Sequence, residues 1–71
     1  MNLIDKIIAY ESGDMSDAEK VYFFSELIKT KQAYTLQGHY GRTANMLIQS
    51  GILFDNGDID EMRAIEYGIE M

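Results

Sequence analysis

Residues 16–31 constrain the fold of this chain more than any other segment. Ser16 followed three residues later by Glu19 is a capping box, the pattern that begins a helix. Its apolar residues recur at helical spacing and cover more than a single stripe of the helix surface: Val21, Tyr22, Phe23, Phe24, Leu27 and Ile28. A helix this apolar either lies at the centre of the core or offers a second face to a partner. We expect the central position, with the helix ending near Thr30 or Lys31.

The composition requires that packed helices or self-association supply the stability. The chain has 71 residues, which make one domain (1–71), and a chain of this length buries only about 60% of the surface that its unfolded form exposes. It has no cysteine to form a disulfide or bind zinc, and no proline to interrupt a helix. We therefore predict an all-α bundle of about four short helices, and we expect a homodimer or a higher oligomer.

The N-terminal residues predict a first short helix. Asn2 is a capping residue, and the helix is expected to run through Ser12 and to end at Gly13. Tyr10, near its end, is expected to fold back onto the core. The apolar stripe that should face the core consists of Leu3, Ile4, Ile7 and Ile8.

The middle of the chain predicts a further helix over residues 39–50, with Gly51 ending it. Together with residues 17–30 it would form a helix-turn-helix-like centre. Residues 32–37 are the least determined part of the chain. They could form a short helix with Tyr34 pointing inward.

The last third predicts a turn followed by a helix. Asn56-Gly57 is a strong hairpin signal, but the acidic residues that follow make a poor strand. We therefore expect Asp58 to cap a helix that runs to the C-terminus and is weakened near its end by Gly68. Its apolar face would consist of Ile59, Met62, Ile65 and Ile69.

The net charge of −6 is concentrated at one end. Residues 52–71 carry six acids against Arg63 alone, a net charge of −5. We do not expect nucleic acid as a partner for such a chain, since phosphate binding requires clustered Lys and Arg, whereas acid clusters suit a basic protein surface. The alternative is that the acids only maintain solubility. The candidate interaction residues of this segment are Asp55, Asp58, Asp60, Glu61 and Glu66.

A second candidate site is the glycine-rich segment 38–43. Gly38, Gly41 and Arg42 could bind an anion at a helix start, where backbone N–H groups approach a phosphate. Alternatively the glycines only permit a bend or close packing, and Arg42 pairs with a carboxylate. His39 lacks the activated nucleophile or paired acid that catalysis needs, so we predict no enzyme. The chain has no cysteine and one histidine, and the acids that follow Asp55 do not fall at the EF-hand spacing. We therefore predict no metal site, and we expect no cofactor.

A DNA-binding regulator is a third possibility. The exposed face of the helix over residues 39–50 would carry side chains that can contact base edges. These are Arg42, Thr43, Asn45 and Gln49. Lysines that could contact phosphates are few.

The chain also resembles a group of small tailed-phage proteins over roughly residues 3–53. The matching positions are Tyr10-Glu11-x-Gly13, Phe24-x-Glu26-Leu27-Ile28-x-Thr30, Ala33-Tyr34-x-Leu36-Gln37-Gly38-x-Tyr40-Gly41-Arg42-x-Ala44 and Leu47-Ile48-x-x-Gly51. Lys31 stands where the group has glycine. The group supplies no catalytic residue to carry over.

The resemblance implies a phage accessory protein that binds and modulates or inhibits a protein complex of the host, such as its transcription or defence machinery. It implies a location in the host cytoplasm. This agrees with the N-terminus, which lacks the pattern of a signal peptide, and with the absence of an apolar run of the roughly 20 residues that would span a membrane. Tyr40 and Arg42 are the candidate anchors, because aromatic residues and Arg dominate binding hot spots. His39 is the remaining candidate contact.

Overall fold

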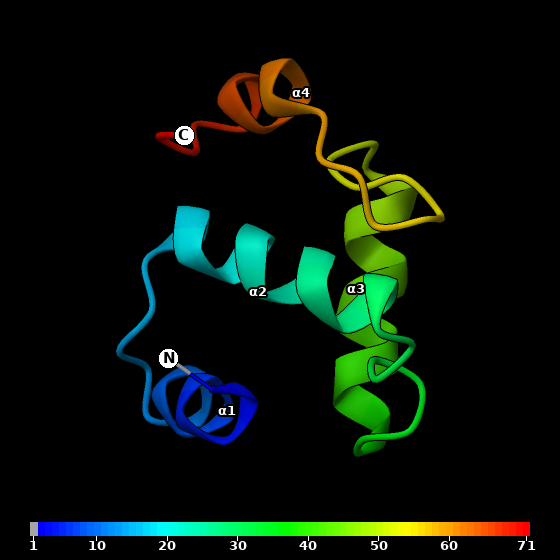
Figure 1. The fold of residues 1–71 in the computed structure, drawn as a ribbon. Coiled ribbons are helices and arrows are strands. Elements are labelled where there is room, and N and C mark those ends of the chain that lie inside the picture. The colour runs from blue at the N-terminus through cyan, green and yellow to red at the C-terminus, as the bar shows by residue number, and fades with distance from the viewer. Residues whose placement is uncertain (1) are drawn as a thin grey trace.

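The computed structural model describes residues 2–71 and contains four helices. They are α1 (Leu3–Glu11), α2 (Asp17–Lys29), α3 (Gly38–Gln49) and α4 (Glu61–Glu66). In Figure 1, α1 and α4 lie on opposite sides of α2, and α3 crosses the C-terminal end of α2. The described residues contain no strand, and their only β-type pairing is one antiparallel bridge between Leu53 and Ile59. The predicted small all-α domain of four helices is therefore confirmed.

Helix α2 lies at the centre of the core, as its wide apolar face predicts. Phe24 and Leu27 are completely buried, and the core also includes Tyr40 and Ala44 of α3. Tyr10 folds back from α1 as predicted, and its ring centroid lies 5.3 Å from that of Phe24 and 5.5 Å from that of Tyr40. The core thus joins α1, α2 and α3 through aromatic side chains.

Helices α2 and α3 pack against each other to form the predicted centre, but a long connection joins them. Residues 30–37 separate them, whereas a DNA-binding helix-turn-helix uses a turn of about 3–4 residues. The connection forms turns rather than the short helix that we considered, and Tyr34 is 57% exposed rather than inward-pointing. Its hydroxyl instead donates a hydrogen bond to Asn45 Oδ1 at 3.1 Å.

All four helices end in the same way, with a residue in the left-handed region after the C-cap. Three of these residues are Gly13, Gly51 and Gly68, and the fourth is Lys31, with φ of 61°. At the end of α2, the Lys31 N–H donates to the Ile28 carbonyl at 3.0 Å and the Gln32 N–H to the Leu27 carbonyl at 2.7 Å. This is the Schellman motif, in which glycine is the usual residue. Lys31 therefore occupies a glycine position.

The segment between α3 and α4 corrects two predictions. The Asn56-Gly57 turn does close a narrow antiparallel loop, in which the Phe54 N–H donates to the Asp58 carbonyl at 2.8 Å. We argued against a hairpin because Asp58 and its neighbours make a poor strand, but a single bridge requires no strand. The capping residue of α4 is Asp60 rather than Asp58, and it accepts a hydrogen bond from the Arg63 N–H at 3.0 Å.

The end of α4 also differs from the prediction. The helix ends at Glu66 instead of continuing to the C-terminus. Gly68 lies outside it at φ +84°, so this glycine terminates the helix rather than weakening it.

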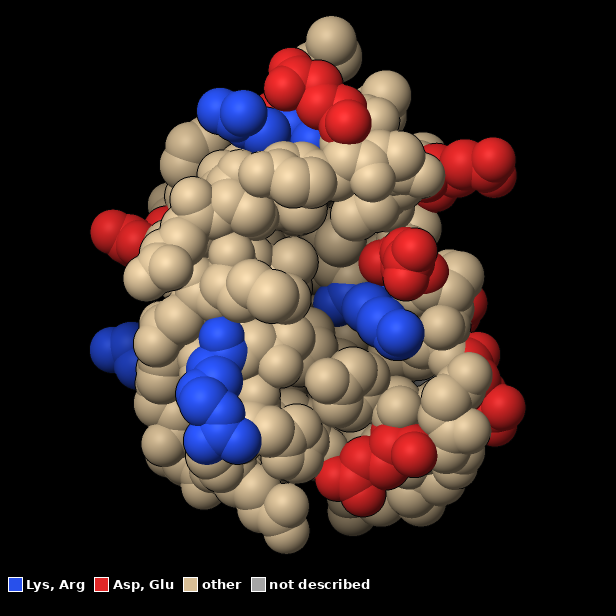
Figure 2. All heavy atoms as spheres, turned by 180° about the vertical axis from the view of Figure 1, so that it is seen from behind, with Lys and Arg blue, Asp and Glu red and all other residues tan. Residues whose placement is uncertain are grey.

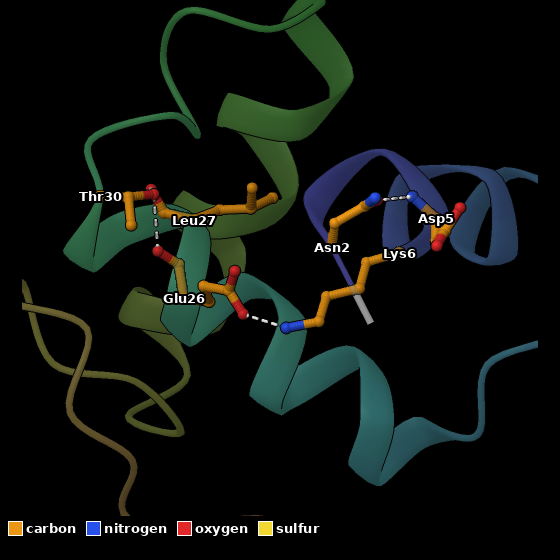
Figure 3. Close-up of polar contacts among 6 residues, drawn as sticks. All are labelled: Asn2, Asp5, Lys6, Glu26, Leu27 and Thr30. Atoms are coloured by element: carbon orange, nitrogen blue, oxygen red, sulfur yellow. Dashed lines mark hydrogen bonds and ion pairs between the residues drawn. The ribbon is translucent and has the colours of Figure 1, made fainter.

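Helix α1 is attached to α2 by a few contacts at one side. Asn2 caps it by accepting the Asp5 N–H at 2.9 Å, and Lys6 forms an ion pair with Glu26 of α2 (Figure 3). The predicted apolar stripe is divided. Leu3 and Ile7 pack against the core, whereas Ile4 and Ile8 are exposed. None of the four helices within residues 2–71 has the length and apolar character needed to cross a membrane.

Candidate interaction surface

Tyr40 of the glycine-rich segment belongs to the core. Its side chain is only 2% exposed, and its hydroxyl donates a hydrogen bond to the Glu11 carboxylate at the end of α1. Burial, and then the neighbouring Glu11 carboxylate, raise the pKa of this hydroxyl above its ordinary value. The prediction that Tyr40 anchors a partner is therefore wrong, because its ring is not accessible. Its role is to connect α1 to α3.

The two glycines of the segment differ in the room around them. A Cβ atom at Gly41 would lie 3.5 Å from the Tyr34 ring and 3.7 Å from the Ala33 carbonyl, which are ordinary contact distances, so the packing of the α2–α3 connection against α3 does not require glycine there. A Cβ atom at Gly38 would lie 3.1 Å from Nη1 of Arg42. The Arg42 side chain therefore lies across the first turn of α3. Gly38 therefore agrees with the interpretation that the glycines permit close packing, whereas Gly41 has room for a Cβ atom.

Arg42 and His39 differ in their surroundings. Arg42 is exposed and takes part in none of the ion pairs among residues 2–71, so the carboxylate partner that we considered for it is not observed. His39 is half-buried, its ring 4.1 Å from that of Tyr40 and stacked at 6.4 Å on Tyr10. Arg42 is thus the side chain of this segment that can contact a partner without rearrangement of the core.

The five predicted acidic residues do not have the same surroundings. Asp58 lies 3.5 Å from the Lys29 ammonium group, Asp60 caps α4, and Glu66 lies 3.7 Å from Arg63. Asp55 and Glu61 are exposed and their carboxylates form no hydrogen bond or ion pair within residues 2–71. The loop between Asp55 and Asp60 is itself held in place, because Ser25 of α2 donates a buried hydrogen bond of 2.6 Å to the Gly57 carbonyl.

Helix α4 carries an exposed pair from the predicted apolar face, whose other two members, Ile59 and Ile69, pack against the core. Met62 is 70% exposed and Ile65 is 53% exposed, whereas Ala64 between them is completely buried. The apolar spacing correctly indicated a helix but not which side faces inward. No signal in a helix of six residues shows which side faces inward, because the side is decided by the packing of Ala64 against the core.

The face of the molecule shown in Figure 2 does not gather its positive charges into one patch. In Figure 2, which shows the side opposite to that of Figure 1, Lys and Arg side chains lie apart on a mostly uncharged surface, and Asp and Glu lie mainly toward its edges. On α3 the exposed amide of Asn45 already accepts a hydrogen bond from Tyr34. Within the described residues, no group of three His, Cys, Asp or Glu side chains is placed to hold a metal ion.

The arrangement of four short helices with an acidic C-terminal segment defines a small helical domain. The chain belongs to the family DUF7417, a domain of unknown function, whose sequence profile matches residues 1–68. No curated protein and no solved structure matches the chain.

Proposed function

We propose that this domain is a non-enzymatic phage accessory protein that binds a protein complex of the bacterial host through its acidic C-terminal segment, residues 52–71. The observation that supports this most is the excess of acidic charge in that segment, a net −5. Part of that charge, on Asp55 and Glu61, is exposed and not used in any internal hydrogen bond or ion pair of the described residues. Unpaired exposed carboxylates steer association with a basic protein surface.

The exposed apolar side chains of the same segment give further support. Phe54, Met62, Ile65 and Tyr67 are all more than half exposed. Interfaces between proteins combine apolar and aromatic contacts at the centre with polar groups at the rim. A segment that carries both kinds of group is suited to a protein partner.

The test is capture of host proteins from a nuclease-treated bacterial lysate with the tagged domain. The triple variant D55N/E61Q/E70Q removes three carboxylates that make no hydrogen bond or ion pair within the described residues. We expect the wild type to retain one host protein in stoichiometric amount, less of it as salt is raised, and the triple variant to retain much less.

A matched pair of double variants controls for the loss of charge. D55N/E61Q removes two carboxylates of the C-terminal segment, and D5N/D14N removes two exposed carboxylates of α1 and of the loop that follows it. D5N/D14N should capture the same protein as well as the wild type does. Equal capture by D55N/E61Q, D55N/E61Q/E70Q, D5N/D14N and the wild type would contradict the proposal. Retention of material only without nuclease would indicate nucleic acid instead.

A further inference from the structure

Helix α4 presents a narrow apolar ridge to solvent. Successive residues of a helix are about 100° apart, so Met62 and Ile65 lie about 60° apart on the side directed away from the buried Ala64. These two side chains are 70% and 53% exposed. A large exposed apolar pair at this spacing is the pattern by which one helix packs against another.

Two glutamates flank the ridge. On the same helical projection, Glu61 lies on one side of the Met62–Ile65 pair and Glu66 on the other, and both are exposed. The one cation of α4, Arg63, lies about 60° beyond Glu66, between Glu66 and Ala64, and its Nε is 3.1 Å from the position that a Cβ of Gly51 would take. It reaches Glu66 at 3.7 Å in a solvent-exposed pair, which neutralises little of that charge. Across the helix the order is therefore acidic, apolar, acidic.

From this order we infer that α4 is the docking ridge for a basic amphipathic helix of the partner, an inference that rests on the proposed function. Such a helix carries an apolar stripe flanked by Lys or Arg, and it complements the ridge in both polarity and charge. A second copy of this chain does not fit in the same way. Pairing two α4 ridges would bring Glu61 and Glu66 of two chains together, each chain with a net charge of −6.

The test uses a designed peptide as the probe. A fluorescent helical peptide of leucine and lysine, with leucines on one face, is titrated with the domain and followed by anisotropy. A peptide of the same composition, with the leucines distributed around the helix, measures the contribution of net charge alone. We expect the amphipathic peptide to bind more tightly than the scrambled one.

Variants then locate the binding site. M62Q/I65Q removes the apolar ridge without changing the charge, and it should weaken binding of the amphipathic peptide about tenfold or more. I4Q/I8Q makes the same chemical change on the other exposed apolar pair, on α1, and should leave binding unchanged. Since Met62 and Ile65 are mostly exposed, circular dichroism should show an unchanged helix content. Glu61→Lys, which reverses one flanking charge, should also weaken binding.

Three results would overturn the inference. The first is an equal effect of M62Q/I65Q and I4Q/I8Q, and the second is equal binding of the two peptides. The third is a wild-type dimer in sedimentation that M62Q/I65Q converts to monomer, which would assign the ridge to a second copy. Capture from lysate separates this inference from the proposed function. If D55N/E61Q/E70Q loses the host protein while M62Q/I65Q retains it, the function stands and the docking ridge is wrong.

Discussion

Replacement of Lys31 by glycine should stabilise the domain. Lys31 is the single residue other than glycine with positive φ within residues 2–71. It occupies the left-handed position of the Schellman motif that follows α2, and a glycine occupies the same position after each of the other three helices. A left-handed conformation costs a residue with a Cβ about 1–2 kcal/mol, and glycine loses about 0.5–1 kcal/mol more than alanine in backbone entropy on folding. The difference is a net gain of about 0.5–1 kcal/mol for Lys31→Gly, which raises the Tm by about 2–8 °C in a domain of this size.

Thermal and urea unfolding followed by circular dichroism measure this gain. Lys31→Ala removes the same charge but keeps a Cβ at φ of 61°, so it should give no comparable stabilisation. Gly13→Lys places a lysine at the equivalent position of α1, where a Cβ would contact nothing within 4 Å, and it should destabilise by a similar amount. If Lys31→Ala stabilises as much as Lys31→Gly, charge rather than backbone strain is the cause and our reasoning is refuted.

Three other substitutions test separate parts of the fold by the same unfolding measurements. Gly57→Ala should destabilise by about 2 kcal/mol or more, because φ is +93° and the added Cβ would lie 2.7 Å from Cγ of Lys29; an unchanged Tm would contradict the close packing of this loop. Gly68→Ala should destabilise by about 1 kcal/mol, since this glycine ends α4 at φ +84°; stabilisation would show that it belongs to the helix instead. Tyr40→Phe should lose about 1 kcal/mol with the hydrogen bond to Glu11. Because the pKa of Tyr40 is raised in the folded state, the unfolded chain ionises first, so wild-type stability should fall as pH rises above about 10, and this part of the decline should be absent from the variant.

Sequence reasoning predicted the local features of the fold. Helix starts at Asn2 and Ser16 and helix ends at Gly13 and Gly51 agree with the structure. The central position of α2 was the preferred of two interpretations of its wide apolar face, the other being a second face offered to a partner, and the burial of Phe24 and Leu27 agrees with it. These features depend on residues close together in the chain or on the number of apolar residues in one helix, and both can be read from the sequence.

The side of α4 that faces the core depends on tertiary packing, which the apolar spacing did not specify. Over six residues a helical period does not distinguish an apolar pair that faces inward from one that faces outward, and only the close approach of Ala64 decides it. Tyr40 is a similar case. An aromatic side chain next to two glycines suits either a binding site or a core, and its contact with Glu11, 29 positions away in the chain, places it in the core.

The candidate site was predicted in composition but not in detail. The acidic charge of the last third can be counted from the sequence. The sequence does not show which carboxylates are unpaired, because Asp58 contacts Lys29 only when the loop packs against α2. The free carboxylates of Asp55 and Glu61 therefore required the structure.

The affinity of the domain for its captured host protein, measured as a function of salt, tests the central claim most directly. If the acidic C-terminal segment makes the contact, the wild-type Kd should rise steeply with salt, and D55N/E61Q/E70Q should show a higher Kd at low salt and a much weaker salt dependence. D5N/D14N, which leaves the C-terminal segment unchanged, should follow the wild type. A Kd that does not change with salt, or a D55N/E61Q/E70Q variant that binds as the wild type does at every salt concentration, would contradict the account.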